Sequence, residues 1–483
     1  MSGSELYFVP SADLLGLSRE LLLVAGGVVI LLLDAFFPRA RTAAVPLALL
    51  TVLGAAALPT GGDTPTPSFG ALLTQDGVTS LLGVVILIAT FLCLLASNGY
   101  LRRERLAPAE YTAILLWCAA GTLLMLRATE LLTVFVALEL FSICLYTLAG
   151  YHRRNVLATE SAIKYFLMGA FVSAFVLLGI AILYGETGTT KVDEIALALN
   201  FSGGLTPAAM WGLLMLVAGF GFKLSLVPFH AWAPDAYQGA PSPFVAFFSV
   251  APKVASAVVL IRVLEIGLYA EDGGNWRSLM ALLAAASMIF GTVVALVQRD
   301  IKRMLAYSGI AHMGYLLIPL ASWDGSAWTS IIVYLLAYAL MNAGAFALVS
   351  ALYDTTDQPH LIDSLAGWGY RFPGVSIALT ICLLSLGGIP PTLGFEAKYL
   401  VFVEAVRAGN LWLALLGAVT SVVGIFYYLR VVYVLYMKPE TAAPRLTIDF
   451  ETRLAGAIGG GGVLLLGLFP DWILGLIQRL AVG

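Results

Sequence analysis

The sequence predicts an all-α membrane protein with about fourteen transmembrane helices. Of its 483 residues, 60% are hydrophobic and only 11% are charged, whereas charged residues make up about 25% of soluble proteins. A lipid-facing surface contains few charges, because each one costs about 3 kcal/mol near the middle of a bilayer. Apolar stretches of about 20 residues, long enough to cross a bilayer as a helix, recur along the whole chain. This composition excludes soluble enzymes and proteins that bind nucleic acids.

Fourteen apolar segments qualify as spans, and they divide the chain into four parts. We expect an N-terminal three-span segment at 1–110, a first five-span unit at 111–265, a second five-span unit at 276–437 and a C-terminal span at 450–483. The individual spans are expected near residues 14–33, 43–59, 78–97, 111–126, 129–149, 160–184, 207–227, 242–264, 276–297, 304–321, 327–352, 374–406, 410–436 and 454–477.

Two apolar segments are longer than one crossing requires. Residues 207–240 and 374–406 would each reach about 50 Å as a continuous helix, against a hydrocarbon core of about 30 Å. Pro228 interrupts the first segment, and Gly387-Gly388-Ile389-Pro390-Pro391 interrupts the second. A discontinuous helix persists in a membrane only where it is buried in protein or lines a water-filled cavity. The sequence therefore predicts two discontinuous helices beside a hydrated pathway.

The two predicted breaks indicate an internal repeat. Leu224-Ser225-Leu226 precedes the first break, and Leu384-Ser385-Leu386 precedes the second, five spans later. Spans four to eight would then correspond to spans nine to thirteen. Because five is an odd number, the two units must cross the membrane in opposite directions, as in transporters built from inverted repeats.

The distribution of basic residues predicts the orientation. One set of loops contains 14 Lys and Arg residues, including Arg102, Arg153, Arg299 and Lys302, and the opposite set contains 6. Cytoplasmic loops of membrane proteins contain the excess of basic residues. We therefore expect both termini on the outer side of the inner (plasma) membrane.

Five ionisable residues fall inside the predicted spans. They are Glu139, Lys164, Lys223, Lys253 and Lys398. Each opposes insertion by about 3 kcal/mol. They could form ion pairs that only hold helices together, and Lys164 could instead reach the membrane surface. Four lysines to one carboxylate favour the other interpretation, in which unpaired lysines exchange protons.

Two histidines are further candidates for proton relays. His230 follows the first break, and His312 lies in span ten, at the position where the repeat predicts a counterpart of Glu139. Each could equally be a hydrogen-bonded core residue. His152 and His360 lie in loops on the basic side, where we expect them to be solvated. The sequence contains no metal-ligand cluster or phosphate-binding loop, so we expect no cofactor in this chain.

Three motifs resemble a known family. They are Lys223-Leu-Ser-Leu-Val-Pro-Phe-His230-Ala-Trp-Ala-Pro-Asp235-Ala-Tyr-Gln-Gly-Ala-Pro-Ser-Pro243, Arg299-Asp-Ile-Lys-Arg-Met-Leu-Ala-Tyr-Ser-Gly-Ile-Ala-His312-Met-Gly-Tyr and Gly388-Ile-Pro-Pro-Thr-Leu-Gly-Phe-Glu-Ala-Lys398. These long motifs resemble the N-type antiporter-like membrane subunit of respiratory complex I, the proton-pumping NADH:quinone oxidoreductase. The resemblance extends over nearly the whole chain.

The resemblance implies a fold, a path and partners. The fold has fourteen helices with two inverted five-helix units, and the proton path passes through Glu139, Lys164, Lys223, Lys253 and Lys398. FMN, iron–sulfur clusters and quinone are expected in other subunits of the complex. The implied partners are membrane lipid and other membrane subunits, including the M-type and the small K-type subunits, in the inner membrane of a bacterium.

Other functions share these features. Subunits of multisubunit sodium/proton antiporters and of membrane hydrogenases have the same fold and lysines, and a purely structural spacer could also retain them. Neighbouring genes for flavin and iron–sulfur subunits would distinguish the oxidoreductase from the antiporter, and a titrating lysine would exclude the spacer.

Overall fold

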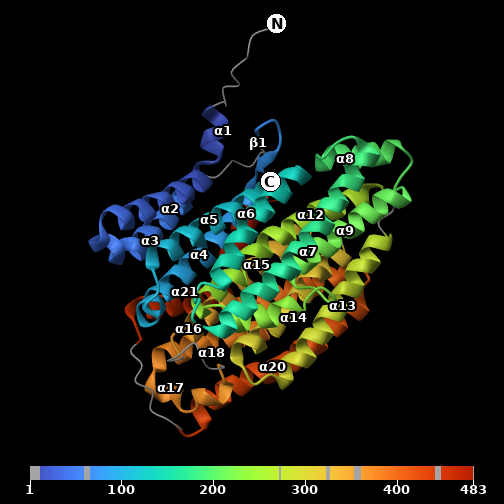
Figure 1. The fold of residues 1–483 in the computed structure, drawn as a ribbon. Helices are drawn as coiled ribbons and strands as arrows, with labels where there is room; N and C mark the ends of the chain where they lie inside the picture. The colour runs from blue at the N-terminus through green and yellow to red at the C-terminus, as the bar shows by residue number, and fades with distance from the viewer. Residues whose placement is uncertain are drawn as a thin grey trace.

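The computed structural model describes residues 11–58, 66–270, 274–322, 327–352, 360–440 and 448–481. Long helices lie side by side in one bundle, with α2 and α3 at one edge and α17 and α20 at another (Figure 1). The first half of the chain forms α1 (Ser11–Gly16), α2 (Ser18–Phe36), α3 (Ala44–Ala57), α4 (Gly77–Arg103), α5 (Pro108–Arg127), α6 (Leu131–Ala149), α7 (Val156–Thr187), α8 (Val192–Phe201), α9 (Pro207–Leu224), α10 (Trp232–Gly239), α11 (Ser242–Phe248) and α12 (Ala251–Ala270).

The second half of the chain continues the bundle. It forms α13 (Gly274–Val297), α14 (Ile301–Ala321), α15 (Trp328–Tyr338), the π-helical turn η2 (Ala339–Ala343), α16 (Gly344–Val349), α17 (Trp368–Arg371), α18 (Pro373–Gly387), α19 (Leu393–Arg407), α20 (Leu411–Met437), α21 (Phe450–Leu468) and α22 (Pro470–Ala481). Two 3-10 turns, η1 (Pro38–Ala43) and η3 (Ile362–Leu365), and a small antiparallel hairpin of β1 (Thr66–Ser68) and β2 (Leu73–Gln75) complete the described elements.

Side-chain caps fix where several of these helices begin. The Glu130 carboxylate accepts a hydrogen bond from the Thr133 amide and starts α6. Asn155 starts α7 in the same way, and Asp300 starts α14. Such caps satisfy backbone donors that a helix leaves free at its N-terminus.

The predicted membrane class is confirmed. Within the described residues, ten helices are long and apolar enough to cross a membrane, and the α21–α22 pair makes an eleventh if it counts as one span. The spans Ser242–Gly267 and Trp328–Val349 are completely buried by other helices, whereas only 33% of the apolar window of α7 is buried. These two spans therefore form the centre of the bundle, and α7 lies at its periphery.

Both predicted helix breaks are present. The first separates α9 from α10, and the second separates α18 from α19. Each break begins with a residue in the left-handed backbone region, Ser225 with φ 62° and Gly388 with φ 77°. Each also contains a cis bond before a proline, Val227-Pro228 and Pro390-Pro391. A left-handed residue ends a helix because it turns the chain away from the helix axis.

The predicted span at 454–477 is bent in the structure. The chain bends by 84° between α21 and α22. Pro470 is the first residue of α22, and proline has no N–H with which to continue the preceding helix. The short helix α8 and the β1–β2 hairpin are two further elements that the hydropathy pattern does not predict.

Candidate functional site

The first group of ionisable residues lies where α6, α7 and α9 meet. The Ser173 hydroxyl of α7 donates a hydrogen bond to Glu139 Oε1. One helical turn after Glu139, Ser142 Oγ accepts a hydrogen bond of 2.8 Å from Lys223 Nζ. No carboxylate oxygen of the described residues lies within 4.0 Å of Lys223 Nζ. Glu139 and Lys223 are therefore joined through one turn of α6 and not by a direct ion pair.

Aromatic rings surround the Lys223 amine. Its Nζ lies 5.5 Å from the ring centre of Phe141, 5.8 Å from that of Tyr146 and 5.9 Å from that of Tyr165. The side chain is 3% exposed. Ring faces attract a cation, and the attraction is stronger where water is excluded. This enclosure can hold a charged amine without a carboxylate in contact.

Lys253 occupies the centre of the bundle, on α12. It is 1% exposed, and its Nζ lies 5.8 Å from the ring centre of Tyr237 and 5.6 Å from that of Tyr338. Within the described residues, no side chain or carbonyl accepts a hydrogen bond from it. Tyr338 is the last residue before the π-helical turn, a local widening that is frequent at functional sites.

His312 of α14 is held by two tyrosines. Its Nδ1 lies 2.7 Å from the Tyr334 hydroxyl, and its Nε2 lies 3.3 Å from the Tyr428 hydroxyl. The Tyr428 hydroxyl also hydrogen-bonds to Ser308 Oγ. A neutral imidazole donates from one nitrogen and accepts at the other, so both contacts can be satisfied together. His312 can thus connect two hydroxyl groups that face it from different helices.

The second break coordinates Lys398 directly. Lys398 Nζ donates to the carbonyl oxygens of Leu386, at 2.9 Å, and Gly387, at 3.1 Å, and to Ser421 Oγ, at 2.8 Å. The carbonyls at the end of α18 have no partner within the helix, because the helix stops at Gly387. A helix end therefore replaces the carboxylate that a buried lysine usually requires.

A series of rings links the first lysine to the central one. Lys223 faces Tyr165, whose ring stacks on Trp232 with centres 4.7 Å apart. Trp232 packs edge to face against Tyr237 at 6.0 Å, and Tyr237 faces Lys253. Residues from α7, α9, α10 and α12 thus form one continuous group.

A second series of rings links the central lysine to the last one. Lys253 faces Tyr338, whose ring centre lies 5.5 Å from that of His312. His312 lies 5.8 Å from Tyr315, and Lys398 Nζ lies 5.0 Å from the Tyr315 ring centre. The structure therefore brings Lys223, Lys253, His312 and Lys398 into one row through the bundle.

Lys164 differs from the other lysines. Its side chain is 45% exposed, and its Nζ lies 2.6 Å from Glu160 and 3.3 Å from Asp235. Asp235 also forms an ion pair with Arg303 at 2.6 Å. A cavity of about 60 Å³ lies beside these residues. The expectation of an unpaired Lys164 is therefore wrong, and the ion-pair interpretation describes its contacts.

The other histidines only partly match their predictions. His230 packs edge to face against Phe290 at 4.4 Å, and its Nδ1 has no hydrogen-bond partner within the described part of the chain. His152 is 7% exposed, with Nε2 lying 3.9 Å from the Glu104 carboxylate, so the prediction of a solvated side chain is wrong.

A buried polar group at the start of α14 escapes the sequence analysis. Because Asp300 caps the helix, Lys302 lies in its first turn and is 2% exposed, so its assignment to a loop is wrong. Lys302 Nζ donates to the Ala240 carbonyl at 2.8 Å, and Ser242 Oγ lies 3.3 Å from His360 Nε2. His360 is 4% exposed, which also contradicts the expected solvation. The N-cap residue before the apolar run was the available signal.

Several known proteins have a similar fold, and some of them also have a related sequence. The family described as "NADH:quinone oxidoreductase/Mrp antiporter, TM" matches residues 128–424. The chain is 38% identical over 464 residues to NADH-quinone oxidoreductase subunit N of Trichlorobacter lovleyi, and the match covers 95% of each chain. A chain of respiratory complex I from Thermus thermophilus with bound aureothin has a TM-score of 0.80 and 33% identity, covering 95% of this chain and 98% of that one. The Mrp complex from Dietzia sp. DQ12-45-1b shows the same fold at 20% identity, with a TM-score of 0.79 and 96% of each chain covered.

Proposed function

The chain belongs to the NADH-quinone oxidoreductase subunit N family, and we propose that it moves protons along its row of buried lysines. It is a proton-translocating membrane subunit of an enzyme complex, and other antiporter-like membrane subunits are its partners. In the complete complex, FMN, iron–sulfur clusters and quinone belong to other subunits. The observation that carries the proposal is the unbroken series of aromatic contacts from Lys223 through Lys253 to Lys398.

Several polar atoms along this row support transfer through water. Lys253 Nζ, Tyr237 Oη and Asn342 Oδ1 are buried and have no hydrogen-bond partner among the described residues. Buried polar groups without a protein partner are usually satisfied by ordered water. The lysines are too far apart for a direct hydrogen bond between them. We propose that water molecules bound to these atoms conduct protons from one lysine to the next.

Lys164 and Glu139 belong to the peripheral part of the path. Lys164 and Asp235 line the small cavity between α7 and α10. Glu139 lies on α6, near the amine of Lys223 but separated from it by one helical turn. We assign Glu139 as the acidic partner of Lys223 and Lys164 as a residue that tunes proton entry. His312 is the relay between Lys253 and Lys398, and His230 is a second relay at the first break.

The geometry of the two breaks supports two inverted five-helix units. Asp235 and Lys398 each lie ten residues after the left-handed residue that begins a break, Ser225 or Gly388. We propose units at 111–265 and 276–437, between an N-terminal segment at 1–110 and a C-terminal segment at 450–483. Counting α2, α3 and the α18–α19 pair with the other spans gives fourteen transmembrane segments.

Mutation of the first pair tests the path. We expect Glu139→Gln and Lys223→Met each to lower NADH-driven proton translocation about tenfold in proteoliposomes, as removal of a positioned acid–base group does. Lys191→Met and Glu194→Gln are matched controls, because these residues form an exposed ion pair beside α8 and lie outside the row. Assembly of each complex is checked by its subunit composition. Parental translocation by assembled Glu139 and Lys223 variants would refute the assignment.

The positive-inside pattern supports an inner membrane location with both termini outside. The four native cysteines are buried, so the parental chain should label weakly with an impermeant maleimide. In spheroplasts, Arg407→Cys should label without lysis and Arg102→Cys only after lysis. The reverse pattern would invert the proposed orientation.

A further inference from the structure

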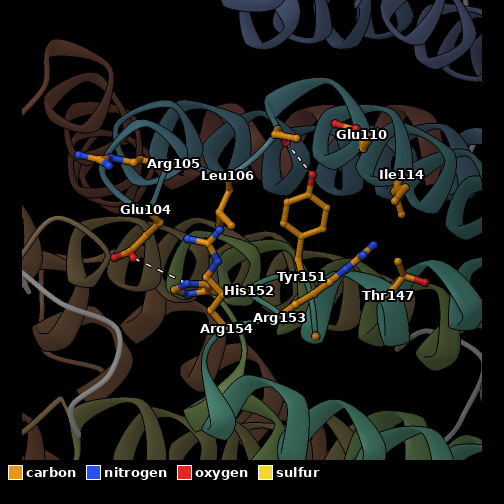
Figure 2. Close-up of a pocket in the computed structure, with 12 residues that line it drawn as sticks. Glu104, Arg105, Leu106, Glu110, Ile114, Thr147, Tyr151, His152, Arg153 and Arg154 are labelled. Carbon is orange, nitrogen blue, oxygen red and sulfur yellow. Dashed lines mark hydrogen bonds and ion pairs between the residues drawn. The ribbon is translucent and has the colours of Figure 1, made fainter. Parts of the chain in front are cut away.

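A cavity of about 510 Å³ lies between the loop after α4 and the loop after α6. Figure 2 shows Arg105 on one loop and Tyr151, Arg153 and Arg154 on the other, with Thr147 of α6 beside them. Because α5 begins and α6 ends here, the cavity lies at one end of the membrane-spanning bundle. We call it the α5–α6 cavity. Its volume is within the range of about 300–1,000 Å³ that is common for small-ligand sites.

Three arginines that line the α5–α6 cavity have no side-chain partner among the residues that the structure describes. Within the described part of the chain, the side chains of Arg105, Arg153 and Arg154 form no hydrogen bond or ion pair. By contrast, Arg41 and Arg102 each contact a carboxylate. Guanidinium groups bind phosphate in two-pronged geometry, so unpaired arginines around one cavity favour a phosphate-bearing ligand.

The backbone of Arg105 supports the same interpretation. Its φ is 52°, a left-handed conformation that side chains other than glycine rarely adopt. A long cationic residue nevertheless occupies this position at the rim of the cavity. Strained backbone of this kind is concentrated at binding and catalytic sites.

The carboxylates that line the cavity do not neutralise its arginines. Glu104 lies 3.9 Å from His152, which is buried beside it, and Glu110 is the other carboxylate that lines the cavity. The Tyr151 hydroxyl donates to the Ala107 carbonyl at 2.6 Å, which fixes the loop next to the arginines. Three arginines and two glutamates therefore line the cavity, which carries a net positive charge and can accept an anion.

The α5–α6 cavity continues onto an apolar face. Val136, Leu140 and Ile143 of α6 are 58%, 45% and 62% exposed, and Thr147 lines the cavity one turn further along. These positions are three or four residues apart, so they lie on one side of the helix. A molecule with a charged head and hydrocarbon chains fits both surfaces at once.

We propose that the α5–α6 cavity binds the phosphate headgroup of an anionic phospholipid, with its acyl chains against α6. Arg153 and Arg154 contact the phosphate, and Arg105 adds positive charge at the rim. Basic pockets between transmembrane helices recognise such headgroups on the side with the basic loops. The lipid is a structural ligand of this subunit, separate from the row of buried lysines.

The test uses the assembled complex in phosphatidylcholine nanodiscs that contain spin-labelled phosphatidylglycerol. We expect Arg153→Gln/Arg154→Gln to reduce the number of immobilised labelled lipids by about one per complex. Arg39→Gln/Arg407→Gln removes the same charge from two exposed positions outside the cavity and should leave the number unchanged. An unchanged number in the first variant, or an equal loss in the control, overturns the proposal.

Two further variants predict opposite signs. Arg153→Lys/Arg154→Lys keeps the charge but loses the two-pronged geometry, so it should retain the immobilised lipid with a lower affinity than the parent. Glu110→Gln removes a repelling carboxylate and should raise the affinity by about twofold. Inorganic phosphate and glycerol 3-phosphate, added without acyl chains, should not displace the labelled lipid. Displacement by either compound would show a site for free anions and overturn the assignment to a lipid, as would weaker binding in Glu110→Gln.

Discussion

The two broken helices hold their nearby lysines in different ways. Lys223 lies at the end of α9, before the first break, and its amine has one hydrogen bond, to the Ser142 hydroxyl. Lys398 lies in α19, after the second break, and its amine donates to two carbonyl oxygens of α18 and to Ser421. A single side chain and several ring faces hold the first amine, whereas the backbone mainly holds the second.

The proton acceptors near these two amines also differ. Glu139 lies one turn of α6 from the hydroxyl that binds Lys223. In α19, Glu396 precedes Lys398 by two residues, a spacing that points the two side chains to different faces of the helix. A backbone carbonyl cannot take up a proton, so on the proposed path water accepts the proton from Lys398. The proposed path therefore pairs the Lys223 amine with a nearby carboxylate and the Lys398 amine with water.

The largest effect is expected at Lys398. Lys398→Met removes the proton site and should lower proton translocation by about tenfold or more, as loss of a positioned acid–base group does. Lys398→Arg keeps the charge but does not release a proton, so it should fail to a similar extent. Proton uptake into proteoliposomes during NADH oxidation measures both effects. Normal translocation by the Arg variant together with failure of the Met variant would make Lys398 an electrostatic anchor.

The hydroxyl partners of the two amines should differ in importance. Ser142→Ala removes the only hydrogen-bond acceptor of Lys223 among the described residues, and such a bond to a charged group is worth about 1.5–3 kcal/mol. Ser421→Ala leaves two carbonyl acceptors on Lys398. We expect about a tenfold loss of translocation for the first variant and less than about twofold for the second. Equal losses of translocation in the two variants would show that Lys223 and Lys398 do not differ in how they depend on their hydroxyl partners.

The smallest effect is expected at an ion pair outside the lysine row. Lys438 Nζ lies 2.8 Å from Asp363 Oδ1, and the hydrogen bond from Lys438 lowers the pKa of the Asp363 carboxyl. A lowered pKa in the folded state stabilises the protein above the unfolded-state pKa, and this stabilisation disappears as the pH falls through the folded-state pKa. Because both side chains are largely exposed, Lys438→Met should cost at most about 0.5 kcal/mol near neutral pH.

Thermal unfolding of the assembled complex measures this difference between parent and Lys438→Met at two pH values. The difference should be present near neutral pH and vanish once Asp363 is protonated in the folded protein. Proton translocation should remain parental, in contrast to Lys398→Met. A large loss of translocation in Lys438→Met would mean that surface ion pairs act on the path as strongly as the buried lysines do.

The sequence predicts the features that depend on helix geometry. Pro228 and the Pro390-Pro391 pair indicate both breaks, because proline removes a backbone donor wherever it occurs. Glu139, Lys223 and Lys253 are identifiable because a charge within an apolar span is costly in any fold. The same reasoning applies to Pro470, at which the predicted final span bends by 84°.

Contacts between distant segments are not visible in the sequence. Nothing in the residues around Lys398 shows that its amine reaches the carbonyls of Leu386 and Gly387. Lys164 resembles the buried lysines in sequence, yet Asp235, which follows the first break, supplies an ion-pair partner. Such contacts depend on how helices pack, and hydropathy along one helix does not specify the packing.

Lys253 lies on α12 at the centre of the bundle, and its Nζ has no hydrogen-bond partner in the described part of the protein. The most direct test of the account is proton translocation by the assembled complex with Lys253→Met, with NADH oxidation by an artificial acceptor as the control for an intact complex. Translocation should fall about tenfold while the control activity is retained. Translocation at the parental rate would contradict a path through the centre of the bundle.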